Sequence, residues 1–161
     1  MDTVQKIEFK EHLQKIQQLH FYHTQDKVQL LNAIRDEFGD KVFQIIEEVE
    51  GEKAFKEWQQ IAIKGENREI KDLIELLWEP LRSKGFEFTY EVKENGIQMH
   101  CTKCPIYELA KALHAEEWLY YHTCQTDPYI AEGFNSNIKL ERKKTLMQGD
   151  SYCDHFYYKQ E

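Results

Sequence analysis

The chain has 161 residues and a formal net charge of −8, because 29 Asp and Glu residues outnumber 21 Lys and Arg residues. This length is typical of one domain that buries roughly two-thirds of its unfolded surface without a metal ion or a disulfide. The longest basic run is only Arg142 to Lys144, so we expect neither nucleic acid nor an anionic membrane as a partner. The N-terminus does not read as a signal peptide, and no apolar stretch approaches the ~18 residues of a membrane span, which favours a cytoplasmic protein with a single domain over residues 1–161.

The first half of the chain, to about residue 83, has the apolar spacing of amphipathic helices. The segments KIQQLHFY and KVQLLNAIRDEF place apolar residues three and four positions apart, with charged residues between them. Gly39-Asp40 predicts the end of one helix and the start of the next. Further helices are predicted in KVFQIIEEVE, in KAFKEWQQIAI and in REIKDLIELLWEPLRSKG, which contains Pro80 and ends at Gly85. The histidines of this half receive no functional role: His12, His20 and His23.

From Phe86 the apolar period changes to two, which is typical of β-strands. The segment FEFTYEVKENGIQMHCT predicts a hairpin around Asn95-Gly96, a pair that suits the positive φ angles of a type I′ turn. A two-residue loop there would place Val92 opposite Met99 and Tyr90 opposite Cys101. Cys101 is then a small buried apolar residue and His100 points to the opposite face. The predicted apolar face is Phe86, Phe88, Tyr90, Val92, Ile97, Met99 and Cys101.

The remaining elements complete an α+β fold. The segment CPIYELAKALHAEEWLYYHTC predicts a helix with Pro105 at an early position, followed by a loop in QTDPYIAEGFNSN. Two more strands are predicted to pair across Gln148-Gly149-Asp150. The expected order is helices, two strands, helix, two strands, with the N-terminal helices packed on a four-stranded antiparallel sheet.

The last hairpin brings reactive side chains to one face. A two-residue loop at either Gln148-Gly149 or Gly149-Asp150 places even-numbered residues before the turn beside odd-numbered residues after it. A cation next to a thiol there would pull the thiol pKa below about 8.5, and an arginine would offer two donors to a carboxylate. The alternative is an ordinary sheet edge, in which Asp150 serves only the turn. The residues expected side by side are Arg142, Lys144 and Leu146 with Cys153, His155 and Tyr157.

The four cysteines all follow residue 100, and in a reducing compartment they are expected as thiols, metal ligands or nucleophiles. Cys101 and Cys104 form a single C-x-x-C pair with no second pair, which by itself indicates little. His122 and Cys124 are two residues apart on a predicted helix and so point to different faces.

The C-terminal half resembles the L-2-amino-thiazoline-4-carboxylic acid hydrolase-like family. The resemblance covers about Phe86 to Tyr158 and the preceding helices, and it depends on a set of spaced residues. It implies a hydrolase that opens a cyclic amidine, the thiazoline ring, to an N-carbamoyl cysteine by acting on a non-peptide carbon–nitrogen bond. The residues that carry the resemblance are Cys104-Pro105, Cys124, Asp127, Gly133-Phe134-Asn135, Ile138, Arg142, Thr145-Leu146, Gly149-Asp150, Cys153 and Phe156.

A more distant resemblance is to the 4-vinyl reductase type of small-molecule-binding domain, in which cysteines and a glutamate hold zinc. Aligning the terminal GD..C motifs carries Cys124 and Cys153 over as ligand positions. Thr145 stands where that family has a cysteine, and Arg142 where it has the glutamate. Zinc needs four ligands and is repelled by arginine, so we expect no cofactor and no structural zinc unless His155 or Asp127 completes the shell.

Together these features give a hypothesis for a small-molecule site. Cys124 would attack the amidine carbon or Asp127 would orient water, with Cys153 as the other candidate nucleophile. Asp150 or His155 would move the proton. The residues expected to bind the substrate, a small carboxylate, are Arg142, Cys104, Phe134 and Tyr157. A homodimer is a further expectation.

Two other functions stay open. The same pocket could belong to a non-catalytic sensor that returns its ligand unchanged, with or without cysteine-bound zinc. The chain could also be a structural domain built around zinc.

Overall fold

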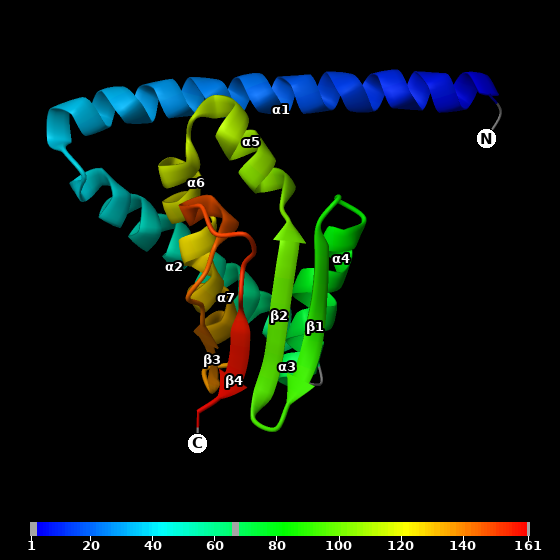
Figure 1. Ribbon diagram of the computed structural model, residues 1–161, viewed down its shortest axis with the longest axis vertical. Coiled ribbons are helices and arrows are strands. Elements are labelled where there is room, and N and C mark those ends of the chain that lie inside the picture. The colour runs from blue at the N-terminus through cyan, green and yellow to red at the C-terminus, as the bar shows by residue number, and fades with distance from the viewer. Residues whose placement is uncertain (1–2, 66–67, 161) are drawn as a thin grey trace. The chain divides into compact units, whose positions relative to one another are not determined.

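A computed structural model describes residues 3–65 and 68–160, with side chains from residue 14 onward (Figure 1). Residues 1, 2, 66 and 67 of the predicted helical half, and the side chain of His12, lie outside this description. The chain divides into two compact units, Met1–Asp40 and Lys41–Glu161. The expectation of one domain stays a prediction.

The first unit consists of helix α1, Thr3–Phe38. The two predicted helical segments run on as this one helix. It ends where predicted, at Gly39. The φ angle of Gly39 is 71°, a value that glycine adopts freely and that strains most other residues. The Gly39 amide donates to the carbonyl of Arg35 at 2.7 Å, and an ion pair of 2.8 Å joins Arg35 to Asp40.

In the second unit, helix α2, Lys41–Lys64, is continuous, and the prediction of two separate helices is wrong. Gly51 lies in the middle of α2 and does not break it. A Cβ at Gly51 would come within 2.7 Å of the Tyr129 ring on helix α7, Asp127–Phe134. The glycine therefore permits close packing of the two helices.

The segment around Pro80 is helical, as predicted, but it contains a wider, π-helical turn just before the proline. It comprises α3, Ile70–Leu73, a π-helical turn η1, Ile74–Trp78, and α4, Glu79–Arg82. Proline has no amide hydrogen and its ring crowds the preceding turn, and such local widening relieves both problems. The helix closes before Gly85, whose φ is 93°.

Four strands form one antiparallel sheet in the order β1-β2-β4-β3, which confirms the α+β fold (Figure 1). The strands are β1, Glu87–Lys93, β2, Gly96–Lys103, β3, Ile138–Glu141, and β4, Phe156–Lys159. The core lies between one face of this sheet and the helices α3, η1 and α7. Its most buried side chains include Leu73, Met99, Phe134, Ile138 and Tyr157.

The first hairpin is confirmed, with its register corrected by two residues. Val92 pairs with Ile97 and Tyr90 with Met99, so the loop is Glu94-Asn95. An even shift keeps each side chain on its predicted face, and Cys101 is buried while His100 is exposed. Tyr90 and Val92, which were predicted on the apolar face, are exposed on the edge strand β1. Glu94 and Asn95 do not have positive φ angles, so the turn is not type I′, and Gly96 is the first residue of β2. Its role is close approach, because a Cβ there would lie 2.2 Å from the Tyr157 carbonyl oxygen.

The connection between β2 and β3 differs from the prediction. The expected single helix divides at His114, whose φ is 51°, into α5, Pro105–Leu113, and α6, Glu116–His122. Pro105 is the first residue of α5, as expected. The expected loop is helical instead, with the turn η2, Cys124–Thr126, leading into α7.

The last two strands pair, but not as a tight hairpin. Residues 142–155 join β3 to β4 and contain a short 3₁₀ turn η3, Leu146–Gln148, followed by Gly149. The predicted parity holds nonetheless, because Leu140 pairs with Tyr157 and Glu141 with Phe156. Among the three residues expected beside Cys153 and His155, Lys144 is exposed and wrongly predicted, whereas Arg142 and Leu146 do lie there.

No helix in the described part of the chain is long and apolar enough to cross a bilayer.

Replacing Gly133 by Ala is expected to destabilise the protein by about 3 kcal/mol, because overpacking against rigid backbone is costly. A Cβ at Gly133 of α7 would lie 2.4 Å from the Phe55 carbonyl oxygen of α2. Urea unfolding measures the effect. Glu132→Ala is the matched control, since Glu132 is exposed and makes only a 3.7 Å ion pair with Lys139. Equal unfolding free energies for the two variants would contradict the tight α2–α7 packing.

Candidate functional site

All four cysteines line one small cavity of about 190 Å³. It lies between the core face of the sheet and the helices η1, α5 and α7. Cys104 caps the start of α5, Cys124 begins η2, and Cys101 and Cys153 exchange backbone hydrogen bonds of 3.0 and 2.9 Å. The structure thus brings Cys104, Cys124 and Cys153 together, as the sequence hypothesis required.

A carboxylate, an imidazole and a guanidinium meet at one side of this cavity. Asp127 and His155 line it, and the Asp127 Oδ2 atom lies 3.0 Å from His155 Nε2. Arg142 Nη1 donates to the same Oδ2 at 2.5 Å and to the carbonyl of Cys124 at 2.9 Å. Only 7% of the Arg142 and His155 side chains and 22% of Asp127 are exposed. The three groups therefore form a largely desolvated cluster.

The hydrogen-bond inventory favours one neutral tautomer of His155. Arg142 Nη1 has two hydrogens, and both are donated, to Asp127 and to the carbonyl of Cys124. None remains for His155 Nε2, 3.4 Å away, which favours the tautomer in which that nitrogen donates to Asp127. The lone pair then belongs to Nδ1, which is buried and has no partner among the described residues. A buried, unpartnered base beside a cavity is a site for a ligand or a water molecule.

A comparison with known protein families identifies the family of this chain. A family model described as L-2-amino-thiazoline-4-carboxylic acid hydrolase matches residues 16–157. The chain belongs to the L-2-amino-thiazoline-4-carboxylic acid hydrolase family. Comparisons with the curated proteins and with the solved structures found no match. The family match confirms the resemblance inferred from the sequence, and it spans every residue that lines the cavity.

The sequence predicted that a neighbouring cation would lower the pKa of a cysteine thiol. In this family member the pKa of every cysteine is raised instead, so the prediction of an activated thiolate is corrected. Burial raises the pKa of Cys153 to about 11 and that of Cys101 to about 12, and it raises the pKa of Cys104 and Cys124 as well. Arg142 acts in the predicted direction on Cys124 and Cys153. Its effect is smaller than that of burial, and at Cys124 the charge of Asp127 opposes it.

Alkylation of these thiols is expected to be slow at pH 8 and to accelerate as the pH approaches 11. Thiolate is the reactive form, and the Cys153 thiol reaches half ionisation near its pKa of about 11. The measurement is the rate of iodoacetamide labelling of each cysteine by peptide mass spectrometry. The same protein unfolded in urea is the control, since its thiols titrate near 8.5. Equal rates in the folded and unfolded protein at pH 8 would contradict the burial of the thiols.

Four predicted site residues do not line the cavity. Arg142 is one of them, and it reaches the site only through its contacts with Asp127, His155 and the carbonyl of Cys124. The Asp150 carboxylate accepts from the amide of Thr145 at 2.8 Å and so holds the turn, which agrees with the alternative reading of that residue. Phe134 is a core residue with its ring edge-on to Trp58 at 6.1 Å. Tyr157 is fully buried, and its hydroxyl accepts from Trp78 Nε1 at 3.1 Å.

Trp78 is a cavity residue that the sequence did not point to. Its ring packs edge-on to His155 with centroids 4.9 Å apart, and it lines the cavity from η1. Residue 78 lies far from the C-terminal motifs in sequence, and in a helix its spacing is that of any core aromatic. Only the fold reveals the contact.

The donor set of the cavity fits zinc poorly. Within the described residues, no group of three or more His, Cys, Asp or Glu side chains is arranged to hold a metal ion. Asp127 and His155, which would have to complete a shell with Cys124 and Cys153, are already in contact with the Arg142 guanidinium. Thr145, in the position of a zinc-family cysteine, is buried and accepts from the Gln148 amide at 3.1 Å. The expectation that no cofactor is needed stays a prediction.

Proposed function

We propose that the protein hydrolyses a small cyclic amidine of the thiazoline type, with His155 as the base that activates water. The observation that carries this proposal is His155 Nδ1, a buried nitrogen of a residue in the cavity wall, which has no hydrogen-bond partner within the described part of the chain. The family name supports the reaction class. The cavity of about 190 Å³ is smaller than the ~300 Å³ at which drug-sized sites begin, so it suits a single small ring.

The proposed reaction adds one water molecule and breaks one ring bond. His155 Nδ1 takes a proton from water as the water oxygen bonds to the amidine carbon between nitrogen and sulfur. The second proton of water passes from the new hydroxyl group to the ring nitrogen as the carbonyl forms. The bond from that carbon to sulfur then breaks, and the sulfur leaves with the proton that His155 returns. The product is an N-carbamoyl thiol. The sequence hypothesis named a carbon–nitrogen bond, but an N-carbamoyl cysteine forms only if the carbon–sulfur bond breaks.

Asp127 and Arg142 have supporting roles in this scheme. Asp127 accepts from His155 Nε2 and stabilises the imidazolium that forms when Nδ1 takes its proton. Arg142 holds the Asp127 oxygen in place and is a positioning residue. Its Nη2 donates to Gln125 Oε1 at 3.3 Å, so the guanidinium is engaged within the protein. This argues for water activation and against Arg142 as the anchor for a substrate carboxylate.

The raised thiol pKa values favour water over cysteine as the nucleophile. At neutral pH the thiolate fraction of Cys153, with a pKa of about 11, is roughly one in ten thousand. Cys124 has its pKa raised further by the Asp127 charge. The cysteines then shape the cavity as small, polarisable side chains.

The direct test is incubation with L-2-amino-thiazoline-4-carboxylic acid and with 2-amino-2-thiazoline, followed by mass spectrometry of the small molecule. We expect a product heavier by one water, formed at similar rates by the wild type and by the single variants Cys124→Ser and Cys153→Ser. Loss of turnover in either folded serine variant would favour a thiol nucleophile. An unchanged small molecule that nevertheless binds would instead favour the sensor function.

A further inference from the structure

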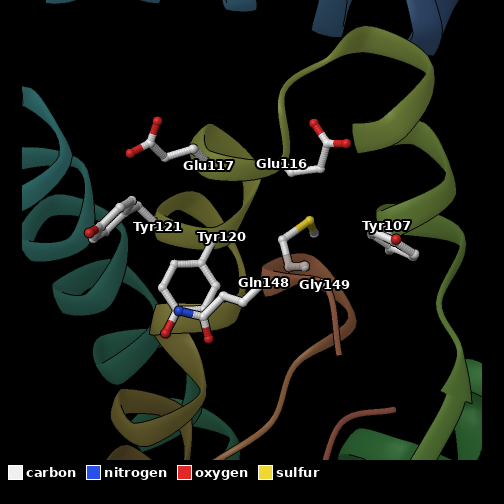
Figure 2. Close-up of a pocket in the computed structure, with 8 residues that line it drawn as sticks. Tyr107, Glu116, Glu117, Tyr120, Tyr121, Gln148 and Gly149 are labelled. Atoms are coloured by element: carbon white, nitrogen blue, oxygen red, sulfur yellow. The ribbon is translucent and has the colours of Figure 1, made fainter. Parts of the chain in front are cut away.

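An open cleft of about 440 Å³ adjoins the buried cavity. Figure 2 shows Tyr107 of α5 on one side of it, Tyr120 and Tyr121 of α6 on the other, and the η3 turn with Gln148 between them. Met147 lines both the cleft and the cavity. This side chain is 6% exposed. It therefore forms the partition between the two spaces.

The neighbouring elements also face both spaces. On α5, Ile106 lines the cavity and the next residue, Tyr107, lines the cleft. On the other side, Tyr120 of α6 lines the cleft, and Cys124 at the start of η2 lines the cavity. Side chains of these turns, Met147 among them, lie at the boundary between the cleft and the cavity that the thiols line. Methionine is the most adaptable of them, because three rotatable bonds let it swing aside.

The cleft is acidic and aromatic. Glu116 and Glu117 stand at its upper edge in Figure 2, at the start of α6. Tyrosine faces attract cations, as carboxylates do. Behind the partition, the carboxylate of Asp127 lines the cavity. Its partner Arg142 does not line it. Two described cations lie near the tyrosines of the cleft. The Lys111 ammonium is 5.6 Å from the Tyr107 ring centroid, and the Arg142 guanidinium carbon, already paired with Asp127, is 5.8 Å from the Tyr120 ring centroid.

We propose that this cleft is the entrance to the cavity, that Met147 is the side chain a substrate displaces, and that Glu116 at the rim selects cyclic amidines without a carboxylate. The substrate class is then a neutral or cationic 2-aminothiazoline, in contrast to the carboxylate in the family name. The catalytic part rests on the proposed function. The entry route does not, so the two are tested separately.

The substrate preference is tested by kinetics on the pair 2-amino-2-thiazoline and its 4-carboxylate. We expect kcat/KM to be ~10-fold higher for the compound without the carboxylate, and Glu116→Gln to narrow the ratio to ~3-fold, as expected for one partly screened charge. Glu94→Gln is the matched control, because Glu94 is exposed in the β1–β2 loop. An equal or higher kcat/KM for the carboxylate would overturn the proposal. If neither compound reacts, the proposed function fails and the entry route is decided by thiol labelling.

The entry route is tested with the cavity thiols as reporters. Two methanethiosulfonates, one with a trimethylammonium and one with a sulfonate group, form mixed disulfides with Cys104 and Cys124 and release methanesulfinate. Each rate is divided by the rate of the same reagent with free cysteine. The cationic reagent is expected to label ~5-fold faster after this correction, and Glu116→Gln to remove most of the difference.

The partition is tested in the same assay. Met147→Ala is expected to accelerate both reagents about equally, and Met147→Phe to slow both. Unchanged rates in folded Met147 variants, or no charge preference that depends on Glu116, would overturn the entry route. If a Met147 variant does not fold, the labelling rates of the wild type, Glu116→Gln and Glu94→Gln still test whether reagents enter through the cleft.

Discussion

Replacing His155 by Gln is expected to lower kcat for the amidine hydrolysis by ~10³-fold, within the range of a lost general base. Glutamine keeps a polar group at the position but has no basic nitrogen to replace Nδ1. Because the ring is buried against Trp78 rather than exposed to substrate on all sides, KM should change much less than kcat. Steady-state kinetics on the purified variant measures both constants.

The matched control for this prediction is His100→Gln. His100 lies on the outer face of β2, stacked on Tyr152 with centroids 3.9 Å apart, and makes no contact with the cavity. It should retain wild-type kcat. If folded His155→Gln, checked by circular dichroism, also retained full turnover, His155 would not be the base.

Replacing Arg142 by Met is expected to lower the free energy of unfolding by about 3 kcal/mol, because one partner of a desolvated ion pair is removed. The substitution leaves Asp127 with His155 alone and frees the carbonyl of Cys124. Methionine nearly fills the volume of the arginine stem, so the loss reports mainly the charge and its hydrogen bonds. Urea unfolding at pH 7 measures the difference.

Lys143→Met is the control for this change. Lys143 is the next residue and has an ion pair of similar length, 2.8 Å to Glu141, but its side chain is 76% exposed. Exposed pairs contribute less than about 1 kcal/mol. If the two variants were destabilised equally, the buried cluster would not hold the 142–155 connection in place.

The fold was largely predictable where the pattern is local. Alternation in residues 86–102 fixes the faces of β1 and β2, and an error of two residues in register leaves those faces unchanged. The same parity argument located Arg142 opposite His155, although η3 interrupts the strands between them. Helix α7 was missed because its sequence resembles a loop. It starts with Asp127-Pro128, and Gly133 and Asn135 lie at its end.

The site was predictable in its residues and less so in its chemistry. The motif spacing brought out Cys124, Asp127, Cys153 and His155, which line one cavity. Sequence gives neither the depth of burial nor the competition for a charge. Arg142 was expected to activate a thiol and bind a carboxylate, but in the fold its donors are taken by Asp127 and the carbonyl of Cys124. Trp78 and Met147 reach the cavity only through tertiary packing.

The central claim is that His155 presents a basic Nδ1 to the cavity while Nε2 donates to Asp127. Nitrogen-15 NMR of the imidazole side chains, with His155 assigned by the His155→Gln variant, measures the protonation of each ring nitrogen directly. The account predicts a protonated Nε2, an unprotonated Nδ1, and a shift of the Nδ1 signal when 2-amino-2-thiazoline is added. A protonated Nδ1 in the neutral ring, or an Nδ1 signal that does not respond to the saturating ligand, would contradict it.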